Sequence, residues 1–260
     1  MVASEFDWQK APQLSVARLL CAVAVPSAMA YGGFHGVLPL LVTRGMPVVL
    51  AWHLVAIVML LGLVCVALWL LHHEAKALSV SLTVRMCLKP LTRKQWCVYL
   101  CVMALGLLAS LAVQPWNLVF MQAFSISVPG YMPFFLNPTL NPQTVDAAGL
   151  SPGYPLSGSY ALLPLMAVTL LLNILAEELY FRAWMLPKLS RFGAWSWVMN
   201  GSLFALYHSF QIWLLPVLWV ASLFFAWVVY SSKSLWPALA AHLVGNLLFT
   251  LVGLALLVAS

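Results

Sequence analysis

The chain has 260 residues, of which 64% are hydrophobic and only 7% are charged, and its mean hydropathy is +0.99. This composition excludes an ordinary soluble domain and indicates a polytopic helical membrane protein, because apolar stretches of about 20 residues are long enough to cross a bilayer. The net charge of +6 is interpreted as Lys and Arg on the cytoplasmic side of a membrane, so the bilayer is an expected partner and nucleic acid is not.

Apolar stretches separated by polar or basic loops predict an all-α transmembrane bundle of about seven helices. The predicted helices, in chain order, cover residues 19–42, 48–71, 96–120, 160–186, 194–215, 217–231 and 235–258. We divide the chain into N-terminal membrane helices one to three (1–120), a connecting loop rich in Pro and Gly (121–159), and a helical core (160–260). The core is the part in which polar residues recur in patterned positions within apolar stretches.

The distribution of basic residues predicts the orientation of these helices. With the N-terminus in the cytoplasm, all of the twelve Lys and Arg residues except Arg44 fall on the cytoplasmic side. The opposite orientation would reverse that count, so we expect the N-terminus inside and the C-terminus outside. The loop 72–95 is then cytoplasmic and the loop 121–159 is external. We expect a multi-pass protein of a bacterial plasma membrane.

Two adjacent carboxylates, Glu177 and Glu178, occur inside the fourth predicted helix. A charged side chain at the centre of a bilayer costs about 3 kcal/mol, so such residues indicate a functional site. Glu178 precedes Arg182 by four residues, the favourable order for an ion pair within a helix. The spacing therefore predicts that Arg182 neutralises Glu178, and that Glu177 must find its partner on another helix.

Two further polar patterns follow on separate predicted helices: F-A-L-Y-H, ending at His208, and H-L-V-G-N, beginning at His242. Phe204 lies one turn before His208 and is expected to brace its imidazole ring. His242 and Asn246 are four residues apart, so they share one face of a helix. The rise of about 1.5 Å per residue places these residues and the carboxylates at similar depths, reached from the cytoplasmic half.

A buried carboxylate and an imidazole can together hold and deprotonate a water molecule. A second His and an Asn can donate hydrogen bonds to a developing oxyanion, so the set suits the hydrolysis of an amide. No cofactor is favoured, although Glu177, His208 and His242 could instead hold a divalent metal such as zinc, with one position left open. Structural roles are expected for His35, His53 and the pair 72–73.

The three patterns E-E-L-Y-F-R, F-A-L-Y-H and H-L-V-G-N resemble those of the CPBP family, the CAAX proteases and bacteriocin-processing enzymes also called the Abi family. The family includes the type II CAAX prenyl endopeptidase, and its pattern is EExxxR, FxxxH and HxxxN or HxxxD on successive membrane helices. The sequence fits all three patterns within about residues 160–250. The resemblance implies an intramembrane endopeptidase whose substrate is a membrane-anchored peptide or protein, with a prenylated CAAX-type substrate as one case.

The resemblance also implies roles for individual residues. Glu177 and His208 activate water, while His242 and Asn246 stabilise the oxyanion. Supporting roles fall to Glu178, Arg182 and Phe204.

Two other classes of function use the same kinds of residue. One is a membrane regulator or bacteriocin-immunity protein that uses this helix bundle without cleaving a peptide. The other is a proton-coupled transporter, which can also employ buried Glu, His and Arg. Transport favours repeated halves with interrupted helices, and no internal duplication is visible in the sequence. The peptidase is the first interpretation, and the regulator is the second.

Overall fold

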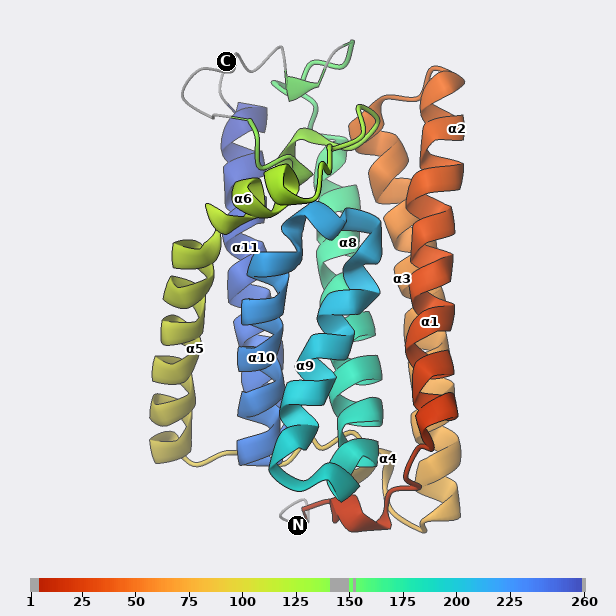
Figure 1. Cartoon of the computed structure of the whole chain (residues 1–260), viewed down its shortest axis with the longest axis vertical. Helices are drawn as coiled ribbons and strands as arrows, with labels where there is room; N and C mark the ends of the chain where they lie inside the picture. Colours follow the sequence, from red (N-terminus) through yellow and green to blue (C-terminus); the bar gives the residue numbers. More distant parts are fainter. Residues whose placement is uncertain (1–4, 141–149, 152, 259–260) are drawn as a thin grey trace.

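The structure is a computed structural model that describes residues 5–140, 150–151 and 153–258. It is an all-α bundle in which the long helices run along a common direction (Figure 1). The α-helices are α1 (Val16–Gly32), α2 (Leu38–Thr43), α3 (Val48–Ala77), α4 (Leu82–Arg85), α5 (Arg93–Val113), α6 (Trp116–Ala123), α8 (Leu162–Glu177), α9 (Ser196–Tyr207), α10 (Leu215–Ser232) and α11 (Trp236–Val258). Two π-helices, η2 (Gly33–Val37) and η4 (Glu178–Met185), and four 3-10 segments, η1 (Trp8–Lys10), η3 (Phe134–Leu136), η5 (Leu186–Trp195) and η6 (His208–Leu214), complete the described elements.

Four helical runs in the described residues are long and apolar enough to cross a membrane: Val16–Thr43, Val48–Ala77, Arg93–Val113 and Leu162–Ser232. The last run has 71 residues. It turns back at η5 and again at η6, so it forms three neighbouring helical segments, which are α8 with η4, then α9, then α10 (Figure 1). Together with α11, the bundle agrees with the predicted polytopic all-α fold. The chain is therefore an integral, multi-pass membrane protein.

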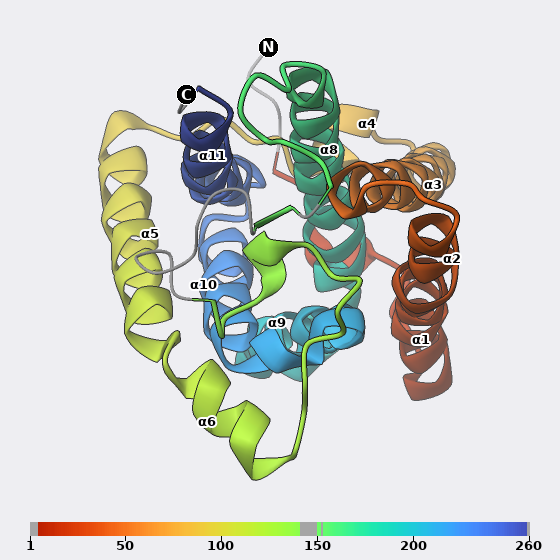
Figure 2. The same cartoon turned by 90° about the horizontal axis from the view of Figure 1, so that it is seen from above.

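The boundaries of the third predicted helix differ from the structure. We expected one span over 96–120, but α5 ends at Val113 and α6 begins at Trp116. Pro115 lies between them and has no backbone N–H to continue the i→i−4 ladder. Figure 2 shows α6 leaving the direction of α5, and α6 packs against α10 and η6.

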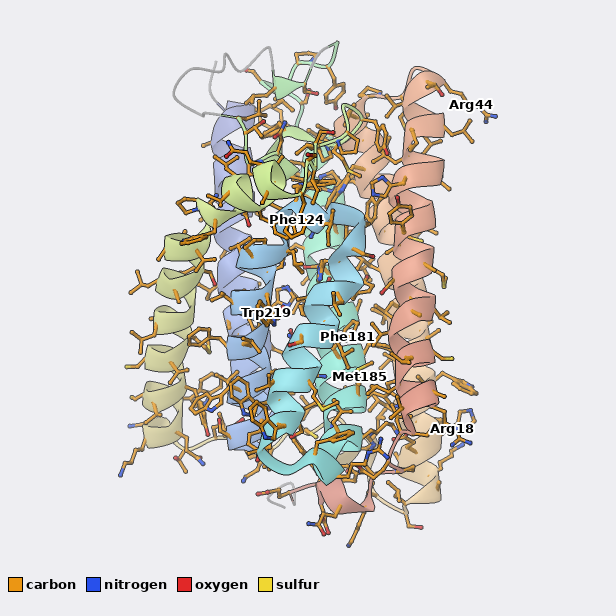
Figure 3. All side chains as sticks on the ribbon, in the orientation of Figure 1. Arg18, Arg44, Phe124, Phe181, Met185 and Trp219 are labelled. Atoms are coloured by element: carbon orange, nitrogen blue, oxygen red, sulfur yellow. The ribbon has the colours of Figure 1, made fainter. Side chains whose placement is uncertain are left out.

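The two ends of the bundle differ in charge. The lower end in Figure 1 holds η1, α4, η5 and the start of α5, where most of the basic residues lie. Figure 3 shows Arg18 at this end and Arg44 at the opposite end, where α6 also lies. Which end faces the cytoplasm remains a prediction.

A buried ion cluster fixes the basic end of the bundle. Glu74, at the end of α3, accepts hydrogen bonds from Nε and Nη2 of Arg85 at 2.9 and 2.6 Å. It also pairs with Lys188 and accepts from Trp184 Nε1 at 2.9 Å. Arg85 Nη1 donates to the carbonyl of Ala183 at 2.8 Å. These bonds satisfy a carbonyl near the end of η4, and they tie η4 to α3 and α4.

The segment before α1 folds across the same end. Phe6 and Trp8 are buried, and the guanidinium carbon of Arg85 lies 4.9 Å from the Phe6 ring centroid. The Lys188 ammonium donates to the carbonyl of Pro12 at 3.2 Å. The start of the chain therefore contributes to the same core as η4 and η5.

Close contact between α9 and α10 depends on a glycine. A Cβ atom on Gly201 would lie 3.0 Å from the Cα of Leu223 in α10. A side chain at this position would have to push the α10 backbone away, so glycine favours the approach, as is common where membrane helices pack tightly. The contact positions the end of α9, where His208 follows.

Candidate active site

The two adjacent carboxylates lie where the helix changes type. Glu177 is the last residue of α8, and Glu178 is the first residue of the π-helix η4. Both side chains are buried in the bundle. A short π-helical turn within an α-helix frequently marks a functional site. The change from i→i+4 to i→i+5 hydrogen bonding also alters which side chains of η4 lie above one another.

Imidazoles from two other helices approach Glu177. The Nε2 atom of His208 lies 3.4 Å from Oε1, and the Nε2 atom of His242 lies 3.6 Å from Oε2. All three residues are at most 7% exposed. The structure thus brings together three of the four predicted catalytic side chains, from α8, from η6 directly after α9, and from α11.

His208 is held by the residue predicted to brace it. Its Nδ1 atom lies 2.9 Å from the carbonyl oxygen of Phe204, and the Phe204 ring lies nearly perpendicular to the imidazole with centroids 4.7 Å apart. A carbonyl oxygen only accepts hydrogen bonds, so Nδ1 of His208 carries a proton. In the neutral imidazole, Nε2 then presents its lone pair toward Glu177.

His242 is held by Glu178. Its Nδ1 atom lies 3.0 Å from Oε1 of Glu178, and its ring lies near Phe225 of α10, with centroids 5.2 Å apart. An ionised carboxylate only accepts, so Nδ1 of His242 is the donor. The bond directs the opposite ring nitrogen, Nε2, at Glu177.

The predicted ion pair between Glu178 and Arg182 is wrong. The three side-chain nitrogens of Arg182 are buried and have no hydrogen-bond partner among the residues that the structure describes, and the guanidinium carbon lies 4.1 Å from the Phe204 ring centroid. The prediction assumed α-helical spacing, whereas η4 is a π-helix from Glu178 onward. Arg182 therefore stacks on an aromatic ring, and Glu178 bonds to another helix.

Asn246 reaches Glu177 through a residue that the sequence patterns did not single out. Its Nδ2 atom donates to Oδ1 of Asn173 at 2.6 Å, and Nδ2 of Asn173 donates to Oε1 of Glu177 at 2.8 Å. The signal available in the sequence was spacing, because Asn173 and Glu177 are four residues apart in α8. The expectation that Glu177 has no partner in its own helix is therefore wrong.

Zinc at Glu177, His208 and His242, the alternative that the sequence leaves open, stays a hypothesis. Among the residues that the structure describes, no three His, Cys, Asp or Glu side chains are grouped so that they could hold a metal ion. The steps proposed below use protein groups and water.

Two other histidines, His35 and His53, contact residues that are distant from them in the sequence. His35 contacts the Tyr131 hydroxyl and the Phe210 carbonyl, each at 2.8 Å. His53 contacts Oγ1 of Thr169 at 2.9 Å and lines a cavity of about 40 Å³ together with apolar side chains. These contacts join helices outside the site at Glu177.

A comparison with protein families finds a match in the second half of the chain. Residues 159–248 match the family described as Type II CAAX prenyl endopeptidase Rce1-like. None of the curated proteins compared matches the chain, and no solved structure matches it. The matched range contains Glu177, His208, His242 and Asn246, and the predicted family resemblance is confirmed. Residues 159–248 of this multi-pass membrane protein are thus similar to the Rce1-like family, which is a family of proteases.

Proposed function

We propose that this chain is an intramembrane endopeptidase that hydrolyses a peptide bond with water activated by Glu177 and His208. The observation that carries the proposal is the placement of one buried carboxylate between two imidazoles, at 3.4 and 3.6 Å. Three polar groups from three helices are costly in an apolar interior, and their grouping favours a chemical role over separate structural ones.

Glu177 is the proposed base. A water molecule beside Glu177 donates one hydrogen to its carboxylate and the other to the lone pair on Nε2 of His208. As the water oxygen attacks the carbonyl carbon of the peptide, its proton passes to Glu177. His208 holds the water throughout, because its bond to the Phe204 carbonyl keeps the lone pair on the side of Glu177.

His242 and Asn246 are the proposed donors to the oxyanion. When His242 carries both ring protons, Nδ1–H is engaged by Glu178. Nε2 lies 3.6 Å from Oε2 of Glu177, too far for a hydrogen bond, so Nε2–H can donate to the negative oxygen of the tetrahedral intermediate. Asn246 uses one N–H of its amide on Asn173 and retains a second. Donors fixed before the reaction stabilise the developing charge without reorganising.

Collapse of the intermediate returns the proton. The C–N bond breaks as Glu177 gives its proton to the nitrogen of the leaving amine. The products are a carboxylic acid and an amine, and Glu177 is again a carboxylate. Each proton removed from water is thus accounted for without a covalent enzyme intermediate.

The proposed substrate is a peptide or protein anchored in the same bilayer. The site lies inside the bundle, and the family match to prenyl endopeptidases favours a substrate with a prenylated Cys in a C-terminal CAAX sequence,. A lipid anchor would concentrate the peptide at the membrane that holds the enzyme.

Cleavage by the purified, reconstituted protein tests the proposal. Liposomes carrying the protein are incubated with a farnesylated peptide ending in a CAAX sequence and with the same peptide lacking the lipid, and fragments are identified by mass spectrometry. We expect cleavage by the native protein and none by Glu177→Gln, which keeps the size of the side chain but not the base. Glu5→Gln, at an exposed residue paired with Lys89, is the matched control and should cleave normally. Cleavage retained by Glu177→Gln would contradict the role of the base.

A further inference from the structure

Two polar residues on α8, one helical turn apart, face two polar residues on α11 that are also one turn apart. Asn173 and Glu177 are four residues apart on α8, and His242 and Asn246 are four residues apart on α11. Four residues correspond to about 6 Å along a helix. The two helices run in opposite directions (Figure 1), so Asn246 meets Asn173 while His242 meets the carboxylates.

The hydrogen bonds of the two amides share one direction. Asn246 donates to Oδ1 of Asn173, and Asn173 donates from Nδ2 to Oε1 of Glu177. An ionised carboxylate offers no donor, so Glu177 must be the acceptor at the end of the chain. Oδ1 of Asn173 then faces Asn246 and needs a donor from it. The order Asn246 to Asn173 to Glu177 therefore follows from the chemistry of the groups.

Asn173 lies closer to the carboxylate of Glu177 than His208 and His242 do. Its amide lies 2.8 Å from Oε1, whereas the ring nitrogens of His208 and His242 lie 3.4 and 3.6 Å from the two oxygens. The final torsion of a Glu side chain is broad and roughly two-fold. A hydrogen bond to one oxygen is therefore needed to hold the carboxylate with Oε1 toward His208 and Oε2 toward His242.

We infer that Asn173 is a positioning residue of the active site, which orients the carboxylate of Glu177 and is itself held by Asn246. The kinetic part of the inference rests on the proposed endopeptidase function. On this view, part of the effect of replacing Asn246 passes through Asn173 to the base. Asn173 lies outside the three sequence patterns that identified the site.

A kinetic comparison separates positioning from simple structure. We expect Asn173→Leu, which is similar in size, to lower kcat by about 10- to 100-fold while KM stays within about twofold, since a misplaced reacting group can cost about 100-fold. Asn173→Asp keeps the shape but places an acceptor against Glu177, and it should lower kcat at least as much. Thr169→Val, one turn away on α8 and bonded to His53, is the control and should keep the native kcat.

The double variant tests the link to Asn246. If Asn246 acts through Asn173, then Asn173→Leu combined with Asn246→Leu should be no more than about threefold slower than the slower single variant. If the two residues act separately, the two reductions in kcat should multiply. Multiplied effects would overturn the link, and a native kcat in Asn173→Leu would overturn the positioning role.

Two measurements do not require cleavage. Dicyclohexylcarbodiimide reacts with carboxyl groups in apolar surroundings, and its rate at Glu177, followed by mass spectrometry of peptides, should change at least threefold in Asn173→Leu and not in Thr169→Val. The change in Tm of the double variant should differ from the sum of the two single changes. If the native protein cleaves no peptide but both results hold, the proposed function fails and the positioning contact stands. An unchanged rate of labelling together with additive Tm changes would overturn the contact.

Discussion

His242 in α11 donates from Nδ1 to Oε1 of Glu178 at 3.0 Å, so the last helix of the chain is bonded to the first residue of the π-helix η4. The bond joins two residues that are 64 positions apart. It leaves Nε2 of His242 pointing at Glu177, at 3.6 Å from Oε2. The orientation of His242 therefore depends on Glu178, the residue next to Glu177.

We predict that Glu178→Leu lowers both the folded yield and the cleavage rate. A buried hydrogen bond to a charged group contributes about 1.5–3 kcal/mol, and Leu removes it. Glu178→Gln retains an oxygen that accepts from His242 and should lose less activity than Glu178→Leu. Folded yield by size-exclusion chromatography and peptide cleavage measure the two effects. Equal activity in the two variants would contradict the role of the His242 contact.

Arg182 is a buried cation whose charge acts on Glu178 and Glu177 without a hydrogen bond to either. We predict that Arg182→Met lowers the folded yield, because it leaves two buried carboxylates without this compensating charge. Arg182→Lys keeps the charge but loses the planar stacking on Phe204, so an intermediate yield is expected. Normal yield of Arg182→Met with a selective loss of turnover would instead assign Arg182 to the chemistry.

The same substitution at two glycines should have opposite effects on stability. Gly201→Ala places a Cβ 3.0 Å from the Cα of Leu223, and overpacking of this kind costs about 1–3 kcal/mol. A Cβ on Gly62 in α3 meets nothing within 4 Å, so Gly62→Ala should stabilise the helix by up to about 1 kcal/mol. Thermal unfolding in detergent measures both. A stabilised Gly201→Ala protein would contradict the close α9–α10 contact.

We predict that cleavage does not depend on a bound metal. After dialysis against a chelator, the protein should keep its rate, because Glu177 and His208 activate water without a Lewis acid in the proposed steps. Elemental analysis before and after dialysis is the companion measurement. About one tightly bound zinc per chain, with activity lost on its removal and restored by zinc, would establish the metal-dependent mechanism instead.

The orientation in the membrane is tested by cysteine accessibility. Thr92→Cys and Thr139→Cys, made in a protein without the other exposed cysteines, should label with a membrane-impermeant maleimide from opposite sides, with Thr92→Cys on the cytoplasmic side. Cys87 can remain in this background, because burial raises the pKa of its thiol to about 11 and keeps it unreactive near neutral pH,. Labelling of both positions from the same side would overturn the predicted topology.

The sequence alone identified the class of fold and the three residues nearest to the proposed chemistry. Long apolar stretches require helices in a bilayer, because every backbone polar group must be paired within its own segment. The polar residues Glu177, His208 and His242 stand out for a related reason, since few other groups in those stretches can ionise. Spacing within one helix also predicted correctly that Phe204 would contact His208.

Local spacing did not determine which polar groups bond across helices. The prediction for Glu178 and Arg182 assumed an uninterrupted α-helix, and the π-helical turn at Glu178 changed the partners of both. Asn173 was passed over because its role exists only when α11 brings Asn246 against it. These contacts depend on the rotation and axial register of packed helices, which are set by the side chains of the whole bundle. The sequence thus determined which residues are polar within the membrane, and the tertiary structure decided which of them hold one another in place.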